Sequence, residues 1–405
     1  MKTVAIITEY NPFHYGHLYQ LDEIRRLYPE GVRIIAVMSG NLTQRGEIAV
    51  ADKSIRAKAA VDAGVDLVLE LPFPYSSSSA EFFARAGAWI AHSIGVVDAL
   101  VFGSESGDIN ELILAAEAMR SSEYLSELSS LTSSQDNAEL GYPRLCEMAL
   151  SSVLGRECKA FFDPNNILAI EYIKALHSFD SNIEPITIKR VSAEYTAKDL
   201  GSGNIQSATA LRPLFSSDPN SALSYIPSGA REVYSEALKN GRAPLDMARL
   251  DTALISFLRL NSPEQIRDIH DASGGLYNRL HNISFEANSI SALMQKAETK
   301  RYTNARIRRA IWNAFLGVTS SEVRSLPAYT QVLAMSSVGR VLLKEIKRKS
   351  NIAVITKPAS YKDMGDAVIH GRELADKADS ILALAESEAI SGRFSLTFTP
   401  YVKKD

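Results

Sequence analysis

Short apolar runs alternate with amphipathic segments along the first hundred residues of the chain. Four runs have the length and composition of buried strands, at 4–7, 32–38, 65–71 and 97–102. Between them, apolar residues recur at helical spacing and predict helices over 15–27, 52–63 and 80–94. Strands that alternate with helices indicate a parallel sheet with right-handed crossovers and helices on both faces. This part of the chain therefore predicts a Rossmann-like α/β domain, in which ligands bind beyond the carboxyl ends of the strands.

The rest of the chain is predicted to be mainly helical. Segment 108–180 has helical patterns, and the serine-rich, proline-containing stretch 216–228 is the best candidate for a linker. The remaining predicted elements are strands at 186–190 and 351–356 and helices at 206–214 and 367–390. We therefore expect an α/β domain over 1–220 and a mainly helical C-terminal domain over 221–405.

The composition narrows the class of protein. Hydrophobic residues make up 46% and charged residues 22% of the 405 residues, which excludes disordered, collagen-like and heptad-dominated chains. The two cysteines, Cys146 and Cys158, are too few for a disulfide framework and lack the spacing of a zinc module, so we expect a reducing compartment and no metal held by the protein. No apolar run is long enough to span a membrane, and a carboxylate at Glu9 comes too early for a signal peptide. A cytoplasmic protein without a membrane anchor is expected.

The segment 11–17, Asn-Pro-Phe-His-Tyr-Gly-His, is the sharpest chemical feature of the sequence. It follows the first predicted strand and opens the first predicted helix. His14 and His17 would share one face of the first helical turn, where backbone N–H groups and the helix dipole favour an anion. Gly16 leaves room between them for a phosphate oxygen or a flat ring. This pattern predicts that both histidines are catalytic and stabilise charge on a reacting α-phosphate. The alternative is a pair of capping histidines without a ligand.

Two further polar clusters are weaker signals. In segment 206–212, the hydroxyls of Ser207 and Thr209 and the guanidinium of Arg212 can converge on a polyphosphate at the start of a helix. Serine-capped helices with an arginine are common, however, so this segment indicates a polyphosphate site only in combination with the histidine pair. The stretch 44–47, together with Lys53 and Arg56, follows the second strand and suits either phosphate or RNA contact or loop-fixing ion pairs.

The segment 296–349 carries a strong local positive charge. It holds twelve lysines and arginines against three glutamates, a local charge of +9 in a chain whose net charge is −3. Tyr302 and Trp312 lie among these cations, as suits RNA backbone contact with stacking. The residues predicted to bind RNA are Lys300, Arg301, Arg306, Arg308 and Arg309. The alternative is a solvated helix face balanced by acidic neighbours in the fold.

Several segments resemble the bacterial tRNA(Met) cytidine acetate ligases, which are HxGH nucleotidyltransferase-like enzymes. They are 9–18, 38–47, 64–72, 102–105, 164–168 and 301–303. Matches extend from residue 5 to about 358, so the resemblance covers most of the chain. It implies a Rossmann-like HxGH nucleotidyltransferase domain with a parallel sheet, followed by a mainly helical, basic, tRNA-binding C-terminal domain.

The resemblance also implies an activity and a set of site residues. The activity is ATP-dependent activation of acetate, through acetyl-adenylate, and transfer of the acetyl group to the wobble cytidine of elongator tRNA(Met), with Mg²⁺ bridging the phosphates. The implied ATP-binding residues are Ile7, Thr8, Glu9, Tyr10, Asn11, Pro12, Phe13, His14, Tyr15, Gly16, His17, Leu18, Tyr19, Gln20, Gly103, Asn165 and Arg190. Asn166 leaves the asparagine assignment open by one residue. Segment 193–196 departs from the glycine-rich, histidine-bearing pattern of the family, and no obligate protein partner is evident.

Two other functions remain open at this stage. The histidine motif also occurs in adenylyltransferases that act on small phosphorylated cofactor precursors, although those enzymes are usually much shorter than this chain. A non-catalytic, nucleotide-sensing RNA binder is the third possibility, and the intact His14, Gly16 and His17 argue against it.

Overall fold

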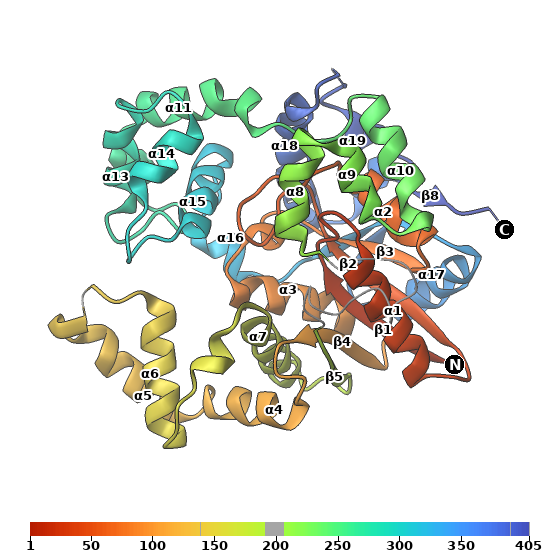
Figure 1. Ribbon diagram of the computed structural model, residues 1–405, viewed down its shortest axis with the longest axis horizontal. Helices are drawn as coiled ribbons and strands as arrows, with labels where there is room; N and C mark the ends of the chain where they lie inside the picture. Colours follow the sequence, from red (N-terminus) through yellow and green to blue (C-terminus); the bar gives the residue numbers. More distant parts are fainter. Residues whose placement is uncertain (138, 191–205, 389, 405) are drawn as a thin grey trace.

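A single sheet of eight strands forms the centre of the protein (Figure 1). The structure is a computed structural model that describes all residues except 138, 191–205, 389 and 405. The strands are β1 (Lys2–Thr8), β2 (Val32–Ser39), β3 (Leu67–Leu71), β4 (Ala99–Ser104), β5 (Glu184–Lys189), β6 (Tyr329–Met335), β7 (Ala353–Ile355) and β8 (Tyr401–Val402). Their order is β5-β4-β1-β2-β3-β6-β7, with β8 paired to β6. Strands β1 to β5 are parallel, as the sequence predicts, and the strand order switches between β1 and β4. The predicted fold class is confirmed.

Helices cover both faces of the sheet because successive side chains of a strand point to opposite sides. Val4 and Ile6 of β1 pack with α1 (Tyr15–Leu27), α2 (Lys53–Asp62) and α10 (Ser228–Lys239). Ala5 and Ile7 belong to the hydrophobic cluster on the other face. The helices that contribute to this cluster are α3 (Ala80–Ser93), α4 (Ile109–Ala118), α5 (Ser122–Ser133), α6 (Tyr142–Leu154), α7 (Pro164–Ser178) and α17 (Ser337–Lys349). Helix α1 has the bounds that its apolar spacing predicts, and Asp52 caps α2 by accepting from the backbone N–H of Ser54.

The C-terminal half contributes to the sheet as well as to helices. Strand β6 runs antiparallel to β3, and the sequence analysis does not predict it. The stretch 216–228 is also not the expected linker: it contains α9 (Pro219–Ser224), and Ala222 and Ile226 are fully buried in the core that also holds β1 and α2. This core draws residues from both sides of position 220, where the sequence analysis places the domain boundary. The boundary stays a prediction.

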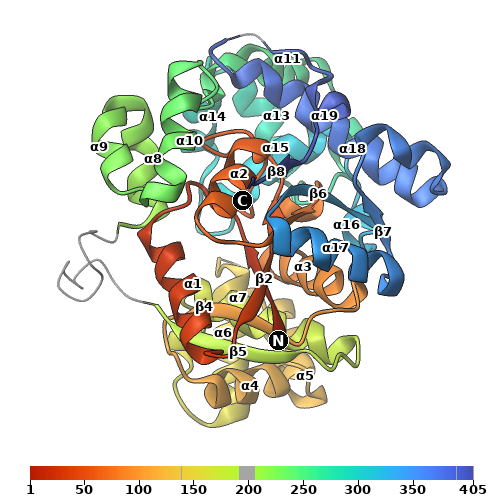
Figure 2. The same ribbon diagram turned by 90° about the vertical axis from the view of Figure 1, so that its right-hand side faces the viewer.

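A separate hydrophobic core lies among the later helices. Its helices are α11 (Asp251–Leu260), α12 (Pro263–Ile266), α13 (Leu276–Ser284), α14 (Ile290–Ala297), α15 (Asn304–Leu316), α16 (Ser320–Arg324) and α18 (Asp366–Leu382). The remaining helices are α8 (Ala208–Ser217) and α19 (Phe394–Thr397). Leu42 and Phe73, from the segments that follow β2 and β3, are buried in this core. The segments that leave the carboxyl edge of the sheet therefore pack against the helical part. In two views, α11 and α13 lie at one end of the molecule and α4–α6 at the other (Figures 1 and 2).

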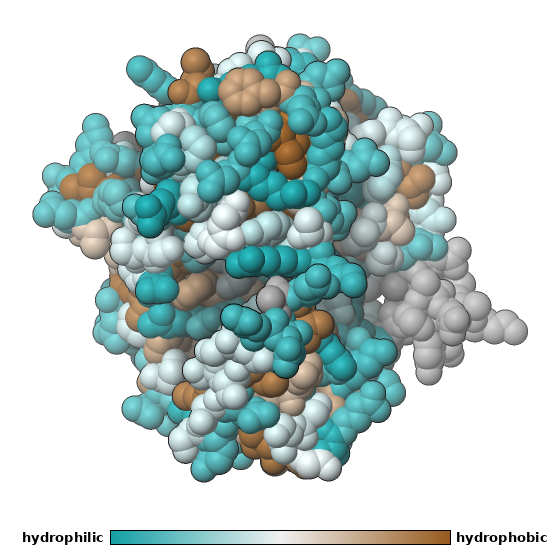
Figure 3. Space-filling model, turned by 90° about the vertical axis from the view of Figure 1, so that its left-hand side faces the viewer, coloured by the Kyte–Doolittle hydropathy of each residue, from teal (hydrophilic) through white to brown (hydrophobic). Residues whose placement is uncertain are grey.

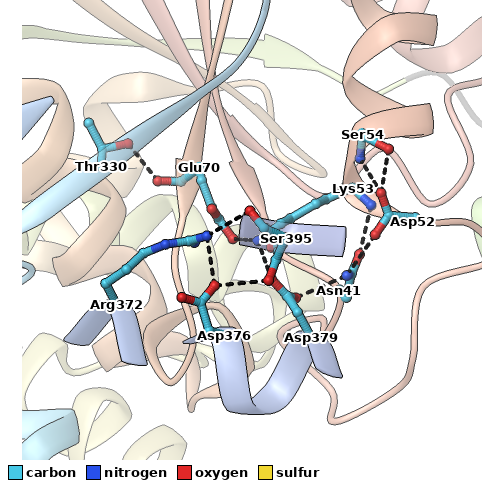
Figure 4. Close-up of polar contacts among 12 residues, drawn as sticks. Asn41, Asp52, Lys53, Ser54, Glu70, Thr330, Arg372, Asp376, Asp379 and Ser395 are labelled. Carbon is cyan, nitrogen blue, oxygen red and sulfur yellow. Dashed lines mark hydrogen bonds and ion pairs between the residues drawn. The ribbon is translucent and has the colours of Figure 1, made fainter. Parts of the chain in front are cut away.

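A buried cluster of charges attaches α18 to the sheet (Figure 4). The ammonium group of Lys53 contacts Glu70 Oε1 at 2.5 Å and Asp379 Oδ2 at 2.6 Å. Arg372 and Asp376, also on α18, form a second ion pair at 2.7 Å. Burial lowers the pKa of Lys53, but the neighbouring carboxylates of Asp379 and Glu70 outweigh this effect and raise the pKa overall, so the lysine is charged. Each buried cation of the cluster is paired with at least one carboxylate, which offsets part of the cost of its burial.

Candidate active site

The two histidines of the motif lie side by side at the start of α1. His14 is the N-cap residue, and its Nδ1 accepts a hydrogen bond from the backbone N–H of Gly16 at 3.0 Å. The Nδ1 of His17 accepts from the backbone N–H of His14 at 3.2 Å. The ring centroids are 3.9 Å apart. The histidines therefore cap the helix, as one interpretation of the sequence has it. The same hydrogen bonds also orient both rings, which the catalytic interpretation requires.

This capping arrangement uses Nδ1 of each ring as an acceptor and leaves Nε2 of each ring as the possible donor. The pKa of His14 is lowered to about 3, mainly by burial and further by the charge of Arg190. The pKa of His17 is also well below its usual value, through burial, His14 and Arg190. Both imidazoles are therefore neutral at pH 7, and since each Nδ1 accepts a hydrogen bond, the proton of each ring lies on Nε2. Two Nε2–H groups are thus held as donors for a ligand oxygen at a helix N-terminus.

The loop between β1 and α1 is held by residues from three other parts of the chain. The carbonyl of Glu9 accepts from buried Arg56 at 2.5 Å, and the side chain of Glu9 accepts from the backbone N–H of Gln44 at 2.9 Å. Asn11 Oδ1 accepts from the backbone N–H of Val50 at 2.7 Å. These contacts fix the approach to the histidines from the β2 side of the sheet.

Tyr234 of α10 supports the same loop from the other side. Its hydroxyl accepts a hydrogen bond from the backbone N–H of Phe13 at 3.0 Å, and the side chain is fully buried. Sequence reasoning misses Tyr234 because 221 residues separate it from Phe13 and no local pattern marks it.

Arg190 and Gly103 lie together at the carboxyl ends of β5 and β4. The backbone N–H of Arg190 donates to the carbonyl of Ser104 at 2.9 Å. A Cβ atom on Gly103 would lie 3.1 Å from Cγ of Arg190, so a larger residue would crowd the arginine. Arg190 is exposed, and its charge acts on both histidines. The structure therefore brings these two predicted residues next to the histidine pair.

The two neighbouring asparagines have different surroundings. Asn166 is fully buried, accepts from the backbone N–H groups of Glu105 and Ser106 at 3.0 and 3.2 Å, and donates to the carbonyl of Ala160 at 2.7 Å. Asn165 is half-buried, and its amide donates to Glu105 Oε1 at 2.6 Å. Asn166 therefore holds the loop after β4, and Asn165 is the one of the two that a ligand can reach. Glu105, which binds both, is a further residue of this loop that the sequence analysis does not assign to the site.

The second polar motif meets the first in space. Ser207 caps α8 by accepting from the backbone N–H of Ala210 at 3.2 Å, and Thr209 Oγ1 accepts from Arg212 at 3.3 Å. Arg212 also reaches the carbonyl of Asn11 in a long hydrogen bond of 3.5 Å, across 201 residues of sequence. A helix N-terminus and a guanidinium thus lie beside the loop that carries the histidines.

The polar cluster after β2 fixes loops through ion pairs and hydrogen bonds. Glu47 pairs with Arg212 at 2.9 Å and with Arg308 of α15 at 3.2 Å. Lys53 belongs to the buried charge cluster, and Arg56 donates to the carbonyls of Ala51, Ser39 and Gly40 as well as Glu9. Of the two interpretations that the sequence allows, loop fixing is the one that these contacts support.

The basic segment 296–349 is divided by the fold into two groups. Lys300 and Arg301 are exposed near the start of α15. The second group is on α17. This helix begins beside Asp66, which precedes β3, and ends beside Ser93, the last residue of α3. This is the edge of the sheet away from the histidines. The exposed cations of this second group are Arg340, Lys344, Lys347, Arg348 and Lys349. The segment therefore does not form one continuous basic surface.

Arg309 requires a correction. It is only 7% exposed, and its guanidinium donates to the carboxylate of Asp271 at 2.7 and 3.4 Å. Arg306 is half-buried and donates to the backbone carbonyls of Asp271 and Ser273. Arg309 is therefore a structural residue of the helical core rather than an accessible RNA contact, because Asp271 already compensates its charge.

Three further expectations concern segment 193–196, membrane spans and metal ligands. Segment 193–196 lies outside the described residues. In the part of the chain that the structure describes, no helix has both the length and the apolarity of a membrane span. The same part contains no group of three or more histidine, cysteine or acidic side chains arranged to hold a metal ion.

The sequence and the fold both match known proteins. Residues 1–392 match the model of the HIGH Nucleotidyl Transferase family. A relative from Acetivibrio thermocellus named tRNA(Met) cytidine acetate ligase is 36% identical over 382 residues, which cover 91% of each chain. The chain belongs to the family of these tRNA(Met) cytidine acetate ligases. A second such ligase, from Alkaliphilus metalliredigens, is 35% identical and matches over the full length of both chains.

Solved structures of this ligase family have the same fold. The crystal structure of Thermotoga maritima TmcAL bound with alpha-thio ATP has a TM-score of 0.90 and 30% sequence identity, and the match covers 99% of each chain. The apo form of the same protein also has a TM-score of 0.90, with 31% identity. The predicted resemblance is therefore confirmed along nearly the whole chain.

Proposed function

We propose that this protein uses ATP to activate acetate and transfers the acetyl group to N4 of the wobble cytidine of elongator tRNA(Met). The observation that carries the proposal is the pair of neutral histidines, whose Nε2–H groups point from a helix N-terminus where Arg190 and Arg212 also gather. The names of the relatives and the nucleotide analogue in the related crystal structure support it.

In the first step, a carboxylate oxygen of acetate attacks the α-phosphorus of ATP, and the bond to the β-phosphate oxygen breaks to release pyrophosphate. Acetate is already ionised at neutral pH, so the step needs positioning and charge stabilisation rather than a base. His14 and His17 donate hydrogen bonds to the phosphate oxygens as charge develops on them. Arg212, Ser207 and Thr209 bind the β- and γ-phosphates, and the segment 7–20 with Gly103, Asn165 and Arg190 forms the rest of the nucleotide site.

Neutral histidines suit this step. A hydrogen bond from a neutral donor costs little charge desolvation in a buried site, and the donors are already oriented before ATP arrives. We propose that Mg²⁺ enters with the triphosphate and is held mainly by phosphate oxygens, since the described residues offer no protein cluster for it.

In the second step, N4 of the cytidine attacks the acetyl carbonyl carbon, the bond from that carbon to the AMP oxygen breaks, and AMP and a proton are released. A mixed anhydride is a strong enough acyl donor for this weakly nucleophilic amine. We propose that Lys300 and Arg301, with Arg306 and Arg308 behind them, contact the RNA backbone. The face with α13 above and α5 and α6 below is mostly hydrophilic and hollowed between its two parts, as suits a nucleic acid (Figure 3).

The test is acetylation of a defined tRNA. Purified protein, ATP, radiolabelled acetate and an elongator tRNA(Met) transcript should give N4-acetylcytidine, detected by mass spectrometry after nuclease digestion. Omission of ATP should abolish the product. Well-folded protein that forms no acetylated cytidine with all substrates present would contradict the proposal.

A further inference from the structure

A cleft opens near the loop that carries the histidines. It has a volume of about 680 Å³ and lies between the loop at 46–48, Arg212 of α8, and helices α14 and α15. Ligand sites for small molecules typically have volumes of about 300–1,000 Å³, so a nucleoside fits. The elements around it meet near the centre of the molecule, where α8 faces α15 (Figure 1).

One residue, Arg212, connects the cleft with the loop that carries the histidines. Arg212 lines the cleft and also donates to the carbonyl of Asn11, three residues before the first histidine. A group bound in the cleft therefore lies next to the loop on which the acetyl-adenylate would form. Arg308, which also lines the cleft, lies on α15 with Arg306, and both are among the cations proposed to contact RNA.

The walls of the cleft combine apolar surface with two carboxylates, those of Glu47 and Glu298. Met247, Met294 and Ile311 supply the apolar surface, which suits a flat base. The carboxylate of Glu47 is fixed by two ion pairs, with one oxygen 2.9 Å from Arg212 and the other 3.2 Å from Arg308. Its side chain is 27% exposed, so a further donor can reach it. The two arginines hold the carboxylate in place from both sides.

A carboxylate in this position distinguishes the pyrimidine bases. Cytosine presents a donor, its N4 amine, at the position where uracil presents the acceptor O4, and glutamate accepts from the cytosine amine. Uracil in the same pose would place two acceptors against each other. The rigidly held Glu47 therefore favours cytosine by both attraction and repulsion.

We propose that this cleft receives the acceptor cytosine and that Glu47 accepts a hydrogen bond from its N4 amine. The inference rests on the proposed function, and it adds the location of the acceptor and the residue that selects it. The buried charge cluster of Figure 4 is no alternative location, because the cavity beside it has a volume of only about 20 Å³.

The first experiment fills the cleft. Gln295, on the exposed side of α14, lines it, and Gln295→Trp should lower the rate of acetyl transfer to tRNA at least tenfold. Acetate-dependent exchange of labelled pyrophosphate into ATP should stay within about twofold of wild type, because it needs no RNA. The matched control is Lys296→Trp on the neighbouring exposed position, which does not line the cleft and should keep both activities. Transfer by the Gln295→Trp variant at the rate of the control would overturn the inference, and so would equal loss of both activities.

The second experiment tests selection by Glu47. Transcripts with cytidine or uridine at the wobble position are compared, the first as substrate and the second as competitive inhibitor. Wild-type protein should bind the cytidine form at least tenfold more tightly. In Glu47→Gln, whose amide can accept or donate, the ratio should fall to within about threefold. A merely structural role would weaken both transcripts alike and leave the ratio unchanged, which would contradict the assignment.

The two levels of proposal fail in different ways. If the wild-type protein forms no acetylated cytidine, the proposed function is wrong and this inference falls with it. If the wild-type protein acetylates cytidine but Gln295→Trp behaves as Lys296→Trp and Glu47→Gln keeps the wild-type binding ratio, only the assignment of the acceptor cleft is wrong.

Discussion

The charge state of single side chains decides what the candidate site can do. His14 and His17 use Nδ1 to accept backbone hydrogen bonds, and burial keeps both rings neutral. A protonated histidine would lose the acceptor that caps α1, so capping and donor orientation depend on the same neutral state. The helix start and the proposed chemistry are therefore linked through two nitrogen atoms.

Replacement of His17 by alanine should remove one of the two donors. We expect acetate-dependent pyrophosphate exchange to fall by about 10²–10³-fold, the usual effect of removing a donor to a developing charge. His177→Ala, at an exposed histidine near the end of α7, serves as the control and should retain full exchange. Exchange that survives in His17→Ala at the level of this control would contradict a catalytic role.

The low pKa of His14 also predicts a pH dependence of stability. Its pKa is about 3 in the folded protein and about 6.5 in the unfolded chain, so as the pH falls below 6.5 only the unfolded chain takes up this proton. The free energy of unfolding should therefore decrease on acidification. The contribution of this one residue between pH 7 and pH 5 is about 2 kcal/mol. In His14→Gln the difference between urea unfolding at these two pH values should shrink by about that amount, and an unchanged difference would contradict the buried neutral state.

At the scale of elements, close docking of loops onto helices builds the site. Trp312 of α15 donates to the carbonyl of Gly46 at 3.1 Å, and the loop that follows β2 carries Glu47 to the helical part. Gly46 has a φ of +72°, and a Cβ there would lie 2.6 Å from Cβ of Arg308. Backbone conformation and contact both require glycine at this position.

Gly46→Ala should therefore destabilise the protein by more than backbone strain alone. We expect a loss of about 3 kcal/mol in the free energy of unfolding, from strain together with overpacking. Gly155→Ala is the matched control, since Gly155 has a similar φ of +64° but nothing within 4 Å of a Cβ. That variant should lose only about 1 kcal/mol. Equal losses in the two variants, measured by denaturant unfolding, would show that the contact with α15 contributes nothing.

At the scale of the whole molecule, one sheet joins the N-terminal and C-terminal parts of the chain. Strands β6 and β8 extend the sheet that begins with β1, and Lys53 of α2 bridges Glu70 of β3 and Asp379 of α18. The C-terminal part is thereby attached to the N-terminal part both through the sheet and through a buried ion-pair bridge.

Lys53→Met should test the buried bridge. It leaves the carboxylates of Glu70 and Asp379 without their cation, and we expect a loss of about 3 kcal/mol or more in the free energy of unfolding. Lys296→Met removes an exposed lysine that pairs with Glu286, and it should cost less than about 0.5 kcal/mol. A loss in Lys53→Met as small as in the control would mean that the cluster adapts without its lysine.

Local sequence patterns predict the order of the first five strands and the central motif. Apolar spacing predicted the bounds of α1, the first five strands and the placement of the histidines between β1 and α1. These features depend on the local periodicity of strands and helices, which a few consecutive residues specify.

Contacts between residues far apart in the chain follow from the packing of the folded protein. The tertiary structure placed Arg212 against Asn11 and Tyr234 against Phe13, distinguished buried Asn166 from accessible Asn165, and enclosed Arg309 with Asp271. It also added β6, whose seven residues are all buried in a region of helical pattern. The physical reason is that pairing and burial depend on the packing of elements far apart in the chain, and local patterns carry no information about a partner two hundred residues away.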